Sequence, residues 1–184
     1  MSTWIWVIIA IGVALIALAV SSLALRSRRS QLLRERFGPE YDRVAADAPT
    51  KRDAESELRS RAERREHFEI RPLSPEQRES YRAHWSAVQA EFVDDPAGAV
   101  AAADSLIQNV MRDRGYPVDD FDTRAADLSV DHPDVVENYR AGHGIATAHE
   151  RGKAGTEELR KALQHYRALF EDLLEVESTQ EVAR

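Results

Sequence analysis

Carboxylate and imidazole side chains gather between residues 131 and 150, in the segment DHPDVVENYRAGHGIATAHE. Such side chains bind divalent metal ions, and they also serve as general acids and bases. The candidate residues are Asp131, His132, Asp134, Glu137, His143, His149 and Glu150. Metal binding and acid–base catalysis are therefore the two chemistries to be weighed for this segment.

The spacing of these residues argues against both chemistries. His143 and His149 are six residues apart, about 240° around a helix, whereas imidazoles four residues apart point at one metal ion. Asp131 and Asp134 flank a proline and are interpreted as helix-start residues, whose carboxylates accept hydrogen bonds from free backbone N–H groups. We therefore predict no catalytic, cofactor-binding or metal site and no enzyme activity. The alternative is a membrane-tethered enzyme or metal-binding protein that uses the Asp131–Glu150 segment.

Composition excludes several other classes of site. The chain has no cysteine, which rules out disulfides, thiolate zinc sites and cysteine nucleophiles. It contains no glycine-rich phosphate loop, nucleophile elbow or kinase signature, and His67, His84 and His165 are expected to be exposed or packing residues. Residues 71–184 hold 13 basic against 22 acidic side chains. Binding to nucleic acid is not expected, because phosphate contacts need clustered Lys and Arg.

The chain begins with a long apolar run, Trp4–Leu25, which contains 22 uncharged residues. As a helix this run would rise about 33 Å, against a hydrocarbon core of about 30 Å. Trp4 and Trp6 suit one membrane interface, and the basic sequence RSRR at residues 26–29 suits the cytoplasmic one. We expect a single-pass protein of the inner (plasma) membrane, with its N-terminus outside and residues 26–184 in the cytoplasm.

Two alternatives concern this apolar run. Ala17-Leu18-Ala19 resembles a signal-peptide cleavage site, and cleavage there would release a secreted helical domain, although a basic n-region is absent. Small side chains also recur along one face of the predicted helix, here called the seam. They would allow two copies to pair through the membrane helix as a homodimer. Alternatively, the pattern reflects only how common alanine is in membrane spans. The seam consists of Thr3, Val7, Ala10, Ala14, Ala17, Ser21 and Ala24.

A charged connector follows, in which RERFGPEYDR reads as a joint between helices. Gly38 tolerates a helix-ending conformation, and Pro39 suits the first position of a next helix, PEYDRVAAD. Phe37 and Tyr41 are expected to pack across this turn, with a partner-docking corner as the alternative. The helix expected over residues 51–69 is mostly charged, and it is interpreted as a spacer, an outer bundle helix or half of a coiled coil.

Four longer helices are predicted beyond residue 72. The first starts at Pro75 with a Ser74–Gln77 capping box, the second starts at Pro96 and ends at Gly115, the third starts near Asp131, and the fourth is capped by Thr156. One short helix is expected between the second and the third. The residues expected on the inner faces are Tyr81, Trp85, Val88, Phe92, Val100, Ala103, Ile107, Val110, Val135, Tyr139, Ala146, His149, Leu159, Leu163, Tyr166, Phe170 and Leu173.

These patterns predict an all-α protein with an N-terminal transmembrane helix, a charged helical connector and a C-terminal helical bundle. The predicted parts are a membrane helix with the basic residues that follow it at 1–29, a connector at 30–71, a cytoplasmic helical domain at 72–176 and a polar tail at 177–184. No strand pattern of comparable length appears.

Several stretches resemble an uncharacterised family of small single-pass membrane proteins from high-GC bacteria, often labelled hypothetical or secreted. The stretches are the apolar N-terminus, RERFGPEYDR, RPLSPEQRESY, FVDDP, RGYPVDDF, ADLSVDHPDVVENYR and HYRALFEDLL. The resemblance implies a bacterial membrane protein and supplies no catalytic residue. The expected function is a membrane-anchored helical scaffold or adaptor, whose partners are the lipid bilayer and a protein.

Overall fold

The computed structural model describes Trp4, Arg28 and residues 30–175, and all regular secondary structure in that part of the chain is helical. The all-α prediction is therefore confirmed for these residues. None of the helices among them is long and apolar enough to cross a bilayer. The predicted span, the small-residue seam and the polar tail lie outside the described residues, apart from Trp4, and they stay predictions.

Internal contacts divide the chain into two compact units, residues 1–58 and 59–184. The division falls inside helix α3, Lys51–Arg65, whose last turns belong to the second unit. The sequence predicts that the connector ends at residue 71 and the helical domain begins at residue 72, beyond this division. That boundary stays a prediction.

The first unit contains the predicted joint between helices. Residues 30–37 are helical, Gly38 has φ 46°, and α2 runs over Pro39–Asp47 with its proline at the first position. The joint is therefore confirmed at the expected residues. Phe37 and Tyr41 are both buried, which confirms that they pack rather than present an exposed docking corner.

Glu55 on α3 collects the polar contacts of this unit. Its carboxylate accepts hydrogen bonds from the Tyr41 hydroxyl at 3.1 Å and from Ser30, and it lies 3.7 Å from the Lys51 ammonium. The Arg34 guanidinium lies 4.8 Å from the centre of the Tyr41 ring, a cation–π contact. The start of α3 is thereby tied to both preceding helical segments.

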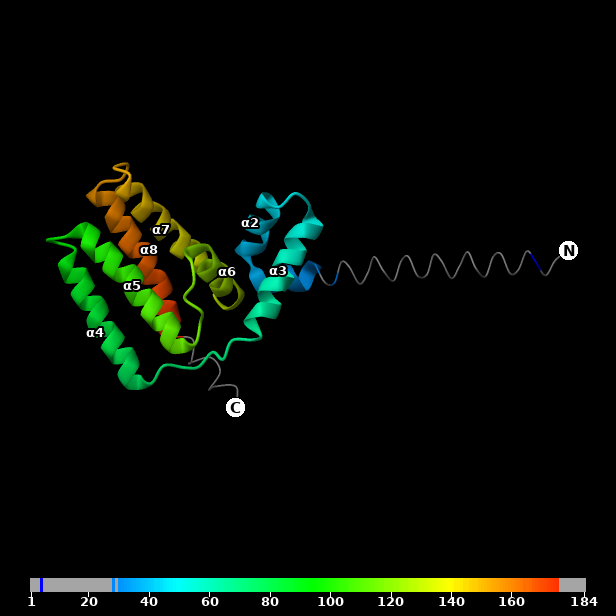
Figure 1. Cartoon of the computed structure of the whole chain (residues 1–184), viewed down its shortest axis with the longest axis horizontal. Coiled ribbons are helices and arrows are strands. Elements are labelled where there is room, and N and C mark those ends of the chain that lie inside the picture. The colour runs from blue at the N-terminus through cyan, green and yellow to red at the C-terminus, as the bar shows by residue number, and fades with distance from the viewer. Residues whose placement is uncertain (1–3, 5–27, 29, 176–184) are drawn as a thin grey trace. The chain divides into compact units, whose positions relative to one another are not determined.

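The second unit is a helical bundle built around α5 and α8 (Figure 1). It contains the end of α3, then α4 (Pro75–Glu91), α5 (Pro96–Arg114), α6 (Phe121–Asp131), α7 (Val136–Glu150) and α8 (Thr156–Glu175). Helix α5 packs against α4 and α8, while α7 packs against α8, α5 and α6.

Local signals set most helix boundaries in the bundle. Ser74 and Gln77 form a reciprocal capping box, with hydrogen bonds of 3.2 and 2.9 Å. Asp95 caps α5, and Gly115 ends it in the left-handed region at φ 91°. These boundaries confirm the predictions made from the sequence.

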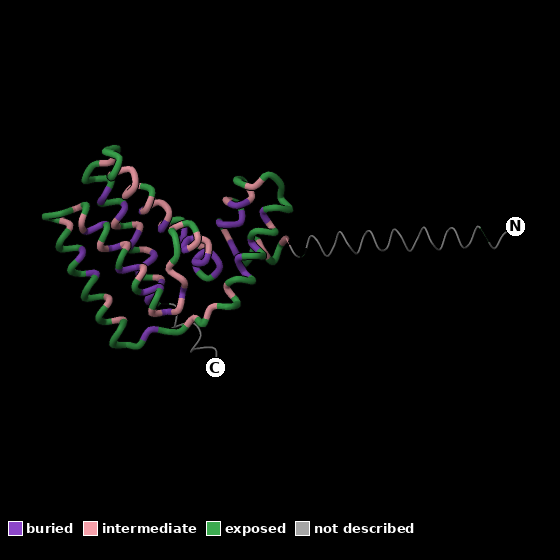
Figure 2. Tube along the Cα trace, viewed as in Figure 1, coloured by how far each residue is buried: buried purple, intermediate pink, exposed green. Residues whose placement is uncertain are grey.

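The core lies between the inner faces of these helices, where buried residues recur along α5 and α8 (Figure 2). The Trp85 ring stacks on the Phe170 ring, with 4.7 Å between ring centres. Most of the predicted inner residues are buried, whereas Tyr81, Phe92, Val135, Ala146 and Leu163 pack at the edge of the core. The apolar stripes are therefore confirmed.

The predicted start of the third long helix is wrong. Asp131 is the last residue of α6, and α7 begins only at Val136, without a side-chain cap. Asp131 therefore does not cap α7. Its carboxylate accepts hydrogen bonds from Arg65 and Tyr116 instead, and the chain turns through His132 and Pro133 before helix resumes.

Candidate functional site

His132 occupies the turn between α6 and α7, and only 3% of its surface is exposed. Its Nδ1 atom contacts the Asp172 carboxylate on α8, and its Nε2 atom lies 3.2 Å from the Tyr116 hydroxyl. Both ring nitrogens therefore have protein partners. A buried imidazole needs such partners, because an unpaired polar group in the interior costs free energy.

The contacts continue from Tyr116 to helix α3. The Tyr116 hydroxyl donates to Asp131 Oδ2 at 2.7 Å, and the same oxygen accepts a hydrogen bond from Arg65 Nε. We call these five residues, Arg65, Asp131, Tyr116, His132 and Asp172, the His132 chain. It links the end of α3 to the last turns of α8, with Tyr116 and His132 buried in its middle and Arg65, Asp131 and Asp172 partly exposed.

Glycine and arginine position the tyrosine of this chain. Gly115 reverses the backbone after α5, so that the next residue, Tyr116, turns inward. The Arg114 guanidinium lies 5.8 Å from the centre of the Tyr116 ring and donates to the Leu173 carbonyl at 2.8 Å. Burial, and secondarily the charge of Asp131, raise the pKa of Tyr116 well above its usual value, so the hydroxyl keeps its proton.

A histidine between a carboxylate and a hydroxyl could serve acid–base chemistry, but this one lacks access. A general base must reach the proton of a substrate, directly or through one water. His132 is nearly fully buried and engages both nitrogens internally. The arrangement is therefore suited to joining helices. Among the described residues, no group of three or more His, Asp or Glu side chains is placed to hold a metal ion.

The other acids and histidines of the 131–150 segment are not brought together. The His143 ring stacks on Phe121 at 3.6 Å between ring centres, and His149 Nδ1 lies 2.7 Å from the Ala154 carbonyl oxygen. Glu137 lies 3.9 Å from Arg140, while Asp134 and Glu150 are exposed. Only Asp131 and His132 of the seven candidates share a cluster.

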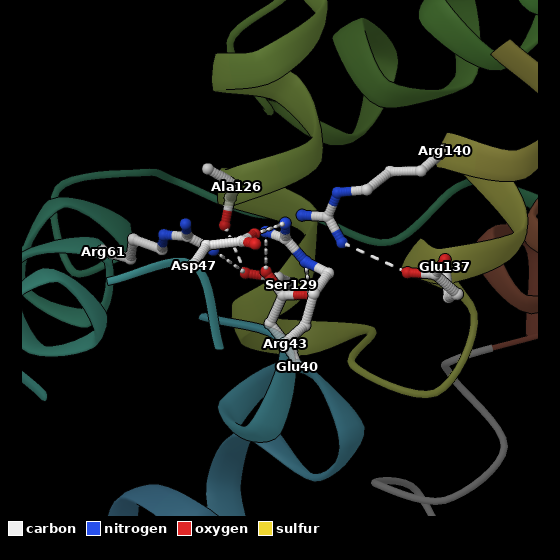
Figure 3. A network of polar contacts seen from close by, with 8 residues as sticks. All are labelled: Glu40, Arg43, Asp47, Arg61, Ala126, Ser129, Glu137 and Arg140. Carbon is white, nitrogen blue, oxygen red and sulfur yellow. Dashed lines mark hydrogen bonds and ion pairs between the residues drawn. The ribbon is translucent and has the colours of Figure 1, made fainter. Parts of the chain in front are cut away.

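Three arginines near the end of α3 bind polar residues of α6. Arg61 donates to the Ser129 hydroxyl at 3.3 Å (Figure 3), and Arg64 Nε donates to Asp127 at 2.8 Å. Arg65 binds Asp131, as described above. Sequence reasoning missed this contact surface, although its signal was present: arginines three and four residues apart on one helix share a face.

Asp127 is the most buried acid of these pairs, with 1% of its side chain exposed, whereas Arg64 is 44% exposed. Burial raises the pKa of Asp127, and the attraction of Arg64 only partly offsets that effect. The ionised carboxylate is therefore held in the fold at a cost that its arginine partner reduces.

Arg64→Met should therefore destabilise the protein more than Asp127→Asn does. We expect a loss of about 1–3 kcal/mol for Arg64→Met, and little loss for Asp127→Asn, which removes the buried charge itself. The penalty of Arg64→Met should shrink as the pH falls, because the folded form with its raised Asp127 pKa takes up the proton first. Urea unfolding of the full chain in detergent at two pH values measures both effects. Equal losses in the two variants would contradict this account.

A second buried network joins α5, α6 and α7. The Tyr139 hydroxyl donates to Asp104 and accepts from Arg124 Nε, both at 3.1 Å. Another Arg124 nitrogen donates to the Asp119 carbonyl at 2.6 Å. Burial raises the pKa of Tyr139 and of Tyr166 far above the usual value.

These buried tyrosines predict unfolding in alkali. Tyr116, Tyr139 and Tyr166 keep their protons in the folded protein beyond pH 10, where unfolded tyrosine ionises, so stability falls as the pH rises above about 10. The expected slope is about 1.4 kcal/mol per pH unit for each tyrosine. Tyrosinate absorbance should appear together with loss of helical circular dichroism. Ionisation of all tyrosines at pH 10 in a protein that stays helical would contradict their burial.

Comparisons with family models, with curated proteins and with solved structures found no match to this chain.

Proposed function

We propose that this protein is a membrane-anchored helical scaffold or adaptor, in which residues 4–25 anchor a cytoplasmic protein-binding bundle. One observation carries the proposal. The His132 chain engages both nitrogens of its histidine in contacts between helices. Its polar groups thus join the end of α3, the turn between α6 and α7, and α8 within the second unit.

The charge of the bundle bears on the kind of partner. Residues 71–184 carry an excess of nine acidic over basic residues, so the long-range field favours a partner with a basic surface and disfavours nucleic acid. A homodimer through the membrane helix is the second association that the sequence suggests, since small side chains allow close approach of two helices.

The absence of cysteine makes the proposed topology simple to test, because any introduced cysteine is the sole labelling site. Lys153 is exposed in the turn after α7, so Lys153→Cys should leave the fold intact. In intact cells, a membrane-impermeant maleimide should not label this variant until the membrane is permeabilised. Ser2→Cys, on the other side of the proposed span, is the matched control and should be labelled at once. Immediate labelling of the Lys153→Cys variant would place the bundle outside and refute the cytoplasmic topology.

A further inference from the structure

The contacts of His132 allow its protons to be counted. Three contacts lie in a row: Asp172 to Nδ1, Nε2 to the Tyr116 hydroxyl, and that hydroxyl to Asp131 Oδ2. Each contact needs one proton between its two heavy atoms. Asp131 supplies none, because the oxygen that meets Tyr116 also accepts a hydrogen bond from the Arg65 guanidinium.

With a neutral imidazole, the three contacts have only two protons between them. Neutral imidazole and a tyrosine hydroxyl hold one N–H and one O–H, two protons for three contacts. The Tyr116 proton goes to Asp131, at 2.7 Å, rather than to Nε2, at 3.2 Å. The hydroxyl oxygen then faces Nε2 as an acceptor, so Nε2 must carry a hydrogen. Nδ1 needs its own hydrogen to meet the Asp172 carboxylate.

The charges around the ring agree with this count. Asp172 faces it from α8, while Tyr116 faces it from the segment after α5. Asp131, at the end of α6, lies one hydrogen bond beyond Tyr116, and Arg65 on α3 lies one further, while the Arg114 guanidinium on α5 lies 5.8 Å from the centre of the tyrosine ring. With a cationic His132, the two carboxylates of the chain are balanced by Arg65 and by the imidazolium, so the buried imidazolium has its counter-charge in Asp172.

We propose that His132 is held as a doubly protonated imidazolium, so that one proton completes or breaks the row of hydrogen bonds from Asp172 on α8 to Asp131 at the end of α6. As the pH rises and the ring loses that proton, the Tyr116 hydroxyl can satisfy either His132 or Asp131, but not both. The row then opens on one side of Tyr116, and the turn between α6 and α7 loses part of its hold on the bundle, while the contacts of α3 with α6 remain. This device does not depend on the proposed membrane anchoring.

The protonation state can be observed directly by nitrogen NMR of the imidazole rings in the full chain in detergent micelles. His132→Gln identifies the His132 signals by their disappearance, and the exposed His84 is the internal control. At neutral pH, His132 should show two protonated, pyrrole-type nitrogens. One pyridine-type nitrogen on His132 at neutral pH would overturn the proposal.

Tyr116→Phe separates the proton count from a general effect of the surroundings, because it removes only the hydroxyl that accepts from Nε2–H. At neutral pH the His132 ring of this variant should then show one pyridine-type nitrogen, with the His84 signals as in the unchanged protein. Two protonated nitrogens on His132 in this variant would also overturn the proposal.

Hydrogen exchange tests the consequence for the turn between α6 and α7. When the pH is raised until the second His132 proton is lost in the NMR spectrum, the amides of Val135 and Val136, which donate to the His132 carbonyl, should lose protection by about tenfold beyond the intrinsic pH effect, while the amides of α5 keep theirs. In Tyr116→Phe the extra loss should already be present at neutral pH. Uniform behaviour of this turn and α5 in both proteins would contradict a proton-dependent contact.

Discussion

Replacing Phe170 with Ala should cost about 3–5 kcal/mol of stability, because the ring is 2% exposed in the middle of the bundle. Its removal takes away the stacking partner of Trp85 and leaves a cavity between α4 and α8. The cavity adds to the cost, because the structure around a truncated core residue relaxes only partly. Denaturant unfolding of the full chain in detergent, followed by circular dichroism, measures the loss.

Val93→Ala is the matched control, because it also shortens an apolar side chain in the same unit. Val93 is 82% exposed in the turn between α4 and α5, so its truncation should change stability by less than about 0.5 kcal/mol. A Phe170→Ala protein as stable as the Val93→Ala protein would mean that α4 and α8 do not pack as described.

Sequence reasoning located the helices of the bundle well where the signals are local. The Ser74–Gln77 box, Pro96 and Gly115 lie within one turn of the boundaries that they set. The burial of Trp85, Ile107 and Phe170 likewise follows from the helical periodicity of the apolar residues along each of their helices. Such features depend on neighbours along the chain, and these can be read without knowing the fold.

The polar contacts could not be predicted in the same way, because their partners are far apart in sequence. Arg65 and Asp131 are separated by 66 positions, and His132 and Asp172 by 40. From the sequence alone, Asp131 and Asp134 beside Pro133 fit the start of a helix. In the folded protein Asp131 binds Arg65 and Tyr116 instead, and these contacts depend on how distant segments pack. The charged face of α3 was likewise interpreted as solvated, because its partners on α6 lie far along the chain.

The His132 chain also changes how an enzyme alternative should be tested. Because His132 joins helices, a variant lacking it would lose stability whether or not the protein is an enzyme. His143 and His149 avoid that difficulty, because neither belongs to the His132 chain: His143 stacks on Phe121, and His149 Nδ1 contacts the Ala154 carbonyl. A double His143→Gln, His149→Gln variant therefore tests chemistry in this segment without breaking the tie to α8.

Removing residues 1–25, the proposed anchor, should abolish function, and this is the largest effect expected of any change. Without that anchor the bundle would no longer be concentrated at the bilayer, where its partner is proposed to lie. The double histidine variant should keep function, because the account assigns no chemistry to those rings. Both variants are compared at matched expression, with folding checked by circular dichroism.

The most direct measurement is complementation of a strain that lacks this protein by three chains: the full chain, the chain without residues 1–25, and a chain whose residues 4–25 are replaced by an unrelated single membrane span. The account predicts that the full chain and the re-anchored chain restore the strain, and that the chain without residues 1–25 does not. Full restoration by the unanchored chain, at equal abundance and with its helices intact, would contradict the membrane-anchored scaffold.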